Sequence, residues 1–209
     1  MIVKEHTKEQ AEQIIDPYVN KLRECVLEAW ERWRASDHAR HLHWKTVMGN
    51  AMCNYFLEVS THAFYPMSAR VRVETKPPYI GMFVESALYL RFKKGKRSLK
   101  TSNVLTKSAK AFHDKSMQID ALEGMTRLEL VYVPSRDLLD IERIMLVCKD
   151  KGRVSWTIDL LARAEPEQTV IEFKPPTPSA PTSTAAKRVI KKKGGVADER
   201  KQHSAGKDS

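Results

Sequence analysis

The spacing of apolar residues changes once along this chain, and that change constrains the fold more than any other feature. In the first third, apolar side chains recur every three or four residues, which is typical of an amphipathic helix. After Tyr65 and Pro66 the spacing becomes two, because Val71 and Val73 alternate with charged residues as in a strand with one buried face. A chain in which helices precede a run of strands predicts an α+β fold.

Two apolar stripes predict two helices in the first third of the chain. Asp16 and Pro17 supply an N-cap and a first-turn proline for the first helix, which we expect to end near Ser36. The second helix is expected over residues 41–63. The stripes consist of Tyr18, Leu22, Cys25, Val26, Ala29, Trp30 and Trp33, and then of Trp44, Met48, Ala51, Met52, Tyr55, Phe56 and Val59. Because each stripe needs an apolar partner, we predict an antiparallel helical hairpin over about residues 17–64.

The following region predicts strands and one further helix. Alternating apolar residues and turn signals place the strands near residues 70–76, 80–85, 87–94, 127–133, 142–149 and 153–160. A short helix capped by Thr106 is expected over residues 106–116. We therefore predict one α+β domain over residues 1–173, in which the helical hairpin packs on an antiparallel sheet of about six strands. The sheet region is expected over about residues 70–160, with the short helix inserted in it.

The C-terminal segment has a different composition. From Lys174 onward the sequence PPTPSAPTSTAA is followed by KRVIKKKGG, and almost none of these residue types form a core. Nine basic and three acidic residues give the segment a charge of +6, which leaves +4 of the chain's total of +10 for residues 1–173. This composition predicts a disordered basic tail over residues 174–209.

Basic residues concentrate in the middle of the chain. Residues 91–115 contain nine lysines and arginines and a single acid, Asp114, which is a local charge of +8. If Leu88 and Leu90 face the core, Arg91 must lie on the opposite face of the same strand. The run therefore predicts a fixed basic face with an adjoining lysine-rich turn, and such a face attracts polyanions, of which nucleic acid is the commonest.

We predict that this basic face binds nucleic acid, and that the tail adds further contacts to phosphates. No helix-turn-helix, zinc-finger or oligonucleotide-barrel signature accompanies the face, so backbone contacts are favoured over base reading, and DNA and RNA stay open. An alternative is an assembly module whose basic face binds an acidic protein partner. The predicted contact residues are Arg91, Lys93, Lys94, Lys96, Arg97, Lys100, Lys107 and Lys110, with Lys187, Arg188, Lys191, Lys192 and Lys193 in the tail.

An arginine–histidine cluster between the first two helices gives an alternative of another class. The cluster combines Arg32 or Arg34 with His38 or His41. An arginine four to six residues before a histidine on a helical hairpin resembles the active motif of the HEPN ribonucleases. The arginine would hold the scissile phosphate while the histidine moves a proton, as in a ribonuclease-type toxin. The cluster falls in an expected inter-helix loop, however, and no other catalytic motif stands out. A binding protein is therefore favoured over an enzyme.

Metal sites, disulfides and membrane segments find little support in the sequence. The histidines near residue 40 match none of the usual zinc spacings, so no metal or other cofactor is expected. Cys25, Cys53 and Cys148 lie far apart in apolar contexts and predict reduced thiols in a cytoplasmic protein. No stretch is long and apolar enough for a signal peptide or a membrane span, so we expect no membrane association.

The segments ALYLRFKKGKRSLKTSNVLTKSAKAFHDK, TRLELVYVPS and IERIMLVCKDKGRVSWTIDL resemble a family of bacterial proteins of uncharacterised function. The shared pattern is an LRFKK strand, here residues 90–94, followed by a Ser-Asn pair, a threonine, an Ala-x-x-Phe segment and three strands. In this chain the middle positions are Ser102, Asn103, Thr106 and residues 109–112. The resemblance covers roughly residues 20–160 and excludes the tail.

Members of this family are often encoded beside a helix-turn-helix regulator fused to a zinc peptidase. The resemblance therefore implies an interaction protein of a mobile-element, toxin–antitoxin or phage-response system, with the adjacent-gene regulator as a partner. It implies neither a toxin nor an antitoxin role, and it supplies no catalytic residues.

Overall fold

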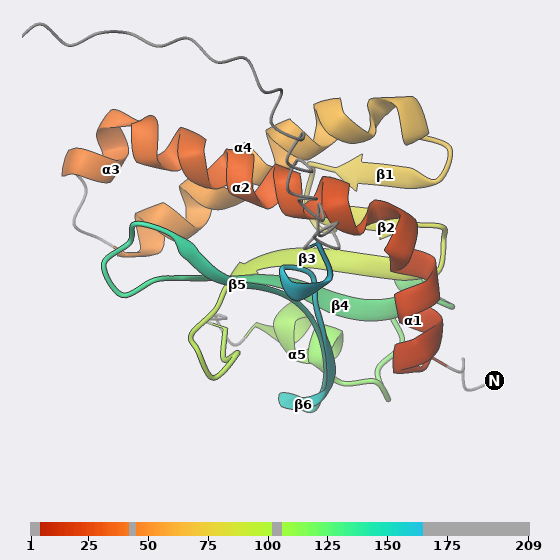
Figure 1. Ribbon diagram of the computed structural model, residues 1–209. Helices are drawn as coiled ribbons and strands as arrows, with labels where there is room; N and C mark the ends of the chain where they lie inside the picture. The colour runs from red at the N-terminus through yellow and green to blue at the C-terminus, as the bar shows by residue number, and fades with distance from the viewer. Residues whose placement is uncertain (1–4, 42–44, 102–105, 165–209) are drawn as a thin grey trace, which may run out of the picture. The chain divides into compact units, whose positions relative to one another are not determined.

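The computed structural model describes residues 5–41, 45–101 and 106–164 as a helical layer and a six-stranded sheet (Figure 1). The helices are α1 (Lys8–Ile15), α2 (Val19–Ala35), α3 (Asp37–His41), α4 (Lys45–Phe64) and α5 (Lys107–His113). The strands are β1 (Val71–Glu74), β2 (Gly81–Val84), β3 (Leu88–Lys94), β4 (Thr126–Pro134), β5 (Ile141–Asp150) and β6 (Arg153–Asp159). Short 3-10 helices are η1 (Asp16–Tyr18), η2 (Tyr65–Met67), η3 (Asp120–Leu122) and η4 (Ala162–Ala164). The predicted α+β class, with its helical hairpin, about six strands and one inserted helix, is confirmed.

Helix α1 lies before the first predicted helix and was not anticipated. Its N-terminus carries a capping box, in which the Gln10 backbone N–H donates to Thr7 Oγ1 at 3.3 Å and the Thr7 N–H donates to Gln10 Oε1 at 2.9 Å. Only Ala11 and Ile15 of this helix are buried, which explains its weak apolar periodicity. Asp16 therefore begins the 3-10 turn η1 between α1 and α2, rather than capping a first helix as predicted.

The strands follow one another in the sheet in chain order, from β1 to β6. All neighbouring pairs are antiparallel except β3 and β4, which are parallel, so the sheet is mixed rather than wholly antiparallel as predicted. The exception has a simple cause, because the connection over residues 95–125 contains α5 and returns the chain to the starting end of β3. The parallel register places Arg91 beside Glu129.

The main core lies between the sheet and the helical hairpin formed by α2 and α4. Leu88, Leu90 and Phe92 of β3 face this core, as the alternation predicted. Figure 1 shows the hairpin along one side of the sheet and α5 on the other. The two sides therefore have different partners, and the site described below lies on the side of α5.

Several predicted features lie outside the described residues. These are Trp44, Ser102, Asn103, His43 from the group of histidines near residue 40, and the whole of the predicted tail, residues 174–209, with its five basic contact residues. All described residues belong to one compact unit, residues 1–169. Among the helices described, none has the length and apolarity needed to cross a membrane.

Candidate nucleic-acid interface

The alternation along β3 gives the sheet a second, chemically different face. Tyr89, Arg91 and Lys93 point away from the helical hairpin, as expected for Arg91 and Lys93, and toward α5. We call this side of the sheet the α5 face. Because α5 and the residues after it cover part of this face, Arg91 and Lys93 are half-buried rather than fully exposed as the sequence suggested.

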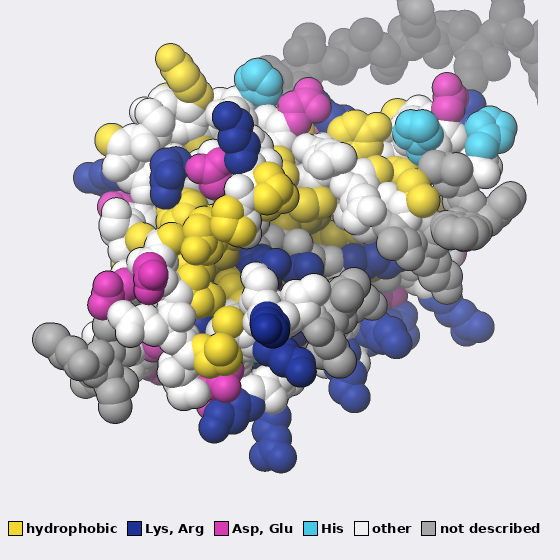
Figure 2. Space-filling view, turned by 180° about the vertical axis from the view of Figure 1, so that it is seen from behind, with side chains coloured by type: hydrophobic (Ala, Val, Ile, Leu, Met, Phe, Trp, Pro, Cys, Tyr) yellow, Lys and Arg dark blue, Asp and Glu magenta, His cyan; other side chains and the backbone are white. Residues whose placement is uncertain are grey.

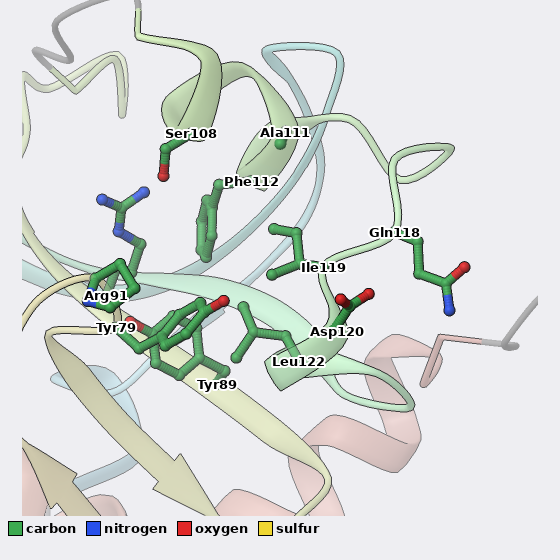
Figure 3. Close-up of a pocket in the computed structure, with 11 residues that line it drawn as sticks. Tyr79, Tyr89, Arg91, Ser108, Ala111, Phe112, Gln118, Ile119, Asp120 and Leu122 are labelled. Carbon is green, nitrogen blue, oxygen red and sulfur yellow. The ribbon is translucent and has the colours of Figure 1, made fainter.

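A pocket of about 300 Å³ lies between β3 and α5 (Figure 3). Its walls include the rings of Tyr79, Tyr89 and Phe112 and the apolar side chains of Ile119 and Leu122. The ring centroids of Tyr89 and Phe112 are 6.0 Å apart with an interplanar angle of 70°, an edge-to-face contact. The Tyr89 hydroxyl donates to the Ile80 carbonyl at 3.0 Å, and burial raises the pKa of Tyr89 to about 12. Tyr89 is therefore a fixed, neutral part of the wall.

Arg91 supplies the positive charge of the pocket. Its guanidinium carbon lies 4.7 Å from the centroid of the Phe112 ring, a cation–π contact. Figure 3 shows the guanidinium beside Ser108 at one end of the pocket, with Asp120 and Gln118 at the other end. Among the described residues, no hydrogen bond or ion pair engages the Arg91 guanidinium, so its N–H donors can serve a ligand.

A buried polar network adjoins this pocket on β4 and β5. The Glu129 carboxylate is 1% exposed, and its Oε2 accepts from Lys149 Nζ at 2.5 Å and from Thr101 Oγ1 at 2.9 Å. Its Oε1 lies 3.3 Å from Nε2 of His113, the last residue of α5. Burial by itself would raise the pKa of Glu129, but the hydrogen bonds from His113 and Lys149, together with the Lys149 charge, lower it to about 2. The network therefore keeps the ionised carboxylate of Glu129 buried between the sheet and α5.

Thr101 reaches this network because the chain after β3 folds back on itself. Gly95 and Thr101 form an isolated antiparallel bridge, and the Gly95 N–H donates to the Tyr132 carbonyl at 2.9 Å. A Cβ atom at position 95 would lie 2.3 Å from Cγ1 of Val131, so only glycine allows this close approach.

A second group of contacts fastens the end of α5 to β4. Nη1 of Arg127 donates to the Ala111 carbonyl at 2.7 Å and to the Met117 carbonyl at 3.2 Å, and its Nη2 donates to the Asp114 carbonyl at 3.2 Å. These carbonyls belong to the last turn of α5 and the residues after it, where helical hydrogen bonding ends. Glu5 lies 3.9 Å from the same guanidinium. Arg127 thus acts as a structural cap and is not available for a ligand.

Lys93 extends the positive charge of the α5 face toward the network. Burial and then the nearby charge of Arg91 lower the pKa of Lys93, with a smaller contribution of the same sign from Lys149. In the described part of the chain, Lys93 has no hydrogen bond or ion pair. Lys149 binds Glu129 directly, whereas Arg91 and Lys93 lie beside it without an ion pair among the described residues, and this positive charge favours a bound anion.

Of the remaining predicted contact residues, four lysines are exposed, while Arg97 and Lys94 have other surroundings. Lys96, Lys100, Lys107 and Lys110 are exposed, and within the described residues none is in an ion pair. Arg97 binds Glu142 instead, with Nε donating to Oε2 at 2.8 Å. Figure 2, a view from behind, shows Lys and Arg side chains gathered at the lower right, where the connection between β3 and α5 lies. We call Lys96, Lys100, Lys107 and Lys110 the lysine surface.

Lys94 occupies a position that the sequence interpretation did not anticipate. The strand β3 continues through Lys94, so alternation places this residue on the hairpin side with Phe92. Its Nζ lies 3.1 Å from Sδ of Met48 in α4. Lys94 is therefore separated from Arg91 and Lys93 by the sheet itself.

The residues of the ribonuclease hypothesis lie on α2 and α3, and that hypothesis stays a prediction. Arg32 binds Glu28 at 2.7 Å and Glu58 at 3.1 Å, while Nη1 of Arg34 lies 3.6 Å from Glu31. His38 and His41 are exposed on α3. Within the described ranges, no group of three or more His, Cys, Asp or Glu side chains could hold a metal ion.

Comparison with known proteins adds no relative: the chain matches no family model, no curated protein and no solved structure. The resemblance to bacterial proteins described above therefore stays a prediction. The candidate interface rests on the chemistry of this chain's own side chains.

Several site residues could not be assigned from the sequence. Tyr79 lies in a loop and gives no signal of its own, and Phe112 entered the sequence analysis only as part of the Ala-x-x-Phe segment. Glu129 carried the clearest available signal, because it is a charge in the middle of an apolar strand segment, whereas Lys149 stands at the end of one. Such a pattern indicates a buried partner, although it does not say which one.

The low pKa of Glu129 predicts an acid-sensitive fold. Because the folded-state pKa of about 2 lies below the 4.5 of a solvated glutamate, ionised Glu129 stabilises the fold above about pH 4.5. This stabilisation should be lost as the pH falls from about 4.5 to about 2. The measurement is the free energy of unfolding by urea across this range for the wild type and for Glu129→Gln, which keeps the shape but cannot ionise. We expect a shallower pH dependence in the variant, and equal slopes would contradict the assignment.

Proposed function

We propose that this chain is a cytoplasmic nucleic-acid-binding protein that contacts its ligand through the α5 side of the sheet. One observation carries the proposal. Arg91 lines an aromatic pocket, and the four exposed lysines of the lysine surface lie beside it. Among the described residues, neither Arg91 nor these lysines form an ion pair. Such a combination provides cations for phosphates and ring faces for bases. Three free cysteines, Cys25, Cys53 and Cys148, with pKa values raised by burial, agree with a reducing compartment.

The individual roles follow from the surroundings of each side chain. The lysine surface supplies mobile point charges, which suit phosphate contacts without sequence preference. Arg97 contributes less, because its donors are engaged by Glu142, and Lys94 contributes little from the hairpin side of the sheet. The contact set that we propose is therefore smaller than the full basic run of residues 91–115.

Charge reversal on α5 tests this proposal. In the full chain, Lys107→Glu with Lys110→Glu should weaken binding of a fluorescent oligonucleotide by at least about tenfold at about 0.1 M salt. The slope of log K against log salt concentration should fall by about 2, since two phosphate contacts are lost. Fluorescence anisotropy over a salt series measures both quantities, with single-stranded and duplex DNA and RNA as probes.

The matched control reverses two exposed charges elsewhere. Arg40→Glu with Arg70→Glu changes the net charge by the same amount, but these residues lie on α3 and just before β1. An equal loss of affinity in the control would show that net charge alone is responsible, and would overturn the assignment to the α5 side. Absence of wild-type binding to all four probes would overturn the function itself.

The resemblance to bacterial proteins supports a role in a mobile-element, toxin–antitoxin or phage-response system. We propose that role as the biological setting of the binding activity. The gene neighbourhood tests it, since an adjacent helix-turn-helix and zinc-peptidase gene is expected.

A further inference from the structure

We propose that the pocket between β3 and α5 binds one unstacked base of a single-stranded nucleic acid, with Arg91 on the phosphate of that nucleotide. The inference rests on the proposed function and names the part of the ligand that this pocket takes. Its evidence is the shape and lining of the pocket, which are independent of the lysine surface.

The lining suits a planar heteroaromatic ring. The half-buried Tyr79 presents a ring on which a base can stack, while the more deeply buried Tyr89, Phe112 and Leu122, together with Ile119, line the walls (Figure 3). Aromatic side chains bind bases by stacking, which contributes about 1–3 kcal/mol per base and tolerates any base. A volume of about 300 Å³ is at the small end of ligand pockets, so it fits one nucleotide rather than a base pair.

The polar groups at the two ends of the pocket determine the orientation in which the nucleotide binds. Arg91 and Ser108 lie at one end and Asp120 at the other (Figure 3). A phosphate is attracted to the guanidinium and repelled by the Asp120 carboxylate, so it must lie at the Arg91 end. The edge of the base then faces Asp120, which can accept hydrogen bonds but cannot donate them when ionised. Bases that carry an amino group should therefore bind better than uracil or thymine.

The surroundings favour a strand over a free nucleotide. Lys107 and Lys110 are exposed on α5, the helix that also supplies Phe112 and Ser108 to the pocket. Neighbouring phosphates of a strand can reach these lysines while one base occupies the pocket. A duplex offers no such base without unpairing, which costs free energy.

Tyr79 provides the sharpest test, because it is half-buried and its replacement removes one ring without opening the main core. Tyr79→Leu should weaken binding of a single-stranded oligonucleotide by about five- to a hundredfold, the equivalent of one lost stacking contact. Binding of a duplex of the same length should not change. Tyr79→Phe keeps the ring and should bind as the wild type does, and thermal unfolding of each variant checks that it folds.

Two further comparisons define the ligand. Arg91→Lys keeps the charge but loses the planar group over Phe112, so it should also weaken single-strand binding selectively. Oligocytidylate should bind more tightly than oligouridylate, because cytosine carries an amino group for Asp120, and Asp120→Asn should reduce that difference. Anisotropy measures the oligonucleotides, and adenosine monophosphate serves as the free-nucleotide competitor.

The outcomes separate this inference from the proposed function. Unchanged single-strand binding in Tyr79→Leu, with weaker binding in Lys107→Glu/Lys110→Glu, would overturn the base pocket while leaving phosphate binding in place. Weaker binding in Tyr79→Leu alone would support the pocket and refute the lysine surface. Tighter binding of adenosine monophosphate than of the oligonucleotide would overturn the assignment to a strand.

Discussion

Replacement of Lys149 by methionine is expected to lower the free energy of unfolding by about 3–5 kcal/mol. The Lys149 side chain is 8% exposed, and its ammonium group binds the buried Glu129 carboxylate at 2.5 Å. Removing the lysine takes the ammonium group away from that buried carboxylate, while Thr101 and His113 still contact it. A buried charge that loses its opposite charge costs far more than the ion pair itself contributes. Urea denaturation monitored by circular dichroism measures the loss.

A double-mutant cycle shows whether the pair itself is responsible. Lys149→Met combined with Glu129→Gln removes both charges, so the combined loss should be smaller than the sum of the two single losses. Lys110→Met removes an exposed lysine and should change the unfolding free energy by no more than about 0.5 kcal/mol. A loss below about 1 kcal/mol for Lys149→Met would contradict a buried, essential ion pair.

Replacement of Phe92 by alanine is expected to cost about 3–5 kcal/mol of unfolding free energy. The Phe92 ring stacks between Phe56 of α4, with centroids 4.2 Å apart, and Tyr132 of β4, with centroids 5.0 Å apart. Its loss would leave a cavity where the hairpin meets the sheet. Phe92→Leu should cost less, because leucine fills part of the same volume.

The control for this prediction is an aromatic residue at the surface. Tyr65 is 78% exposed, so Tyr65→Ala should change the unfolding free energy by no more than about 0.5 kcal/mol. A similar loss in Phe92→Ala and Tyr65→Ala would refute the role of the stacked rings. Phe92 also lies between the half-buried cations Arg91 and Lys93, so residues 90–93 serve packing on one face and carry charge on the other.

The helices and strands of this fold could be predicted because their side chains alternate with a clear period. Leu88, Leu90 and Phe92 identify both the extent of β3 and its buried face. The parallel pairing of β3 with β4 could not be predicted, because it depends on the path of the connection between them. Helix α1 was not predicted from the sequence, because only two of its residues are buried and its apolar periodicity is therefore weak.

The candidate site could be predicted only in part. Arg91 followed from the alternation of β3, and the exposed lysines followed from the composition of the turn and α5. The aromatic walls come from separate segments, with Tyr79 before β2 and Phe112 in α5, and only tertiary packing brings them together. The Glu129 network likewise needs the register of β4 and β5, and next to Lys149 the pairing of β5 with β6 shifts between Cys148 and Lys149.

The parallel pairing of β3 and β4 has a consequence for how a fold of this kind can diversify. Two parallel neighbours require a long connection across one face of the sheet, and here residues 95–125 form it. That connection supplies Ser108, Phe112 and Asp120 to the pocket, whereas the pairing of the strands does not depend on these side chains. Substitutions in the connection can therefore alter ligand preference while the strand scaffold is inherited unchanged.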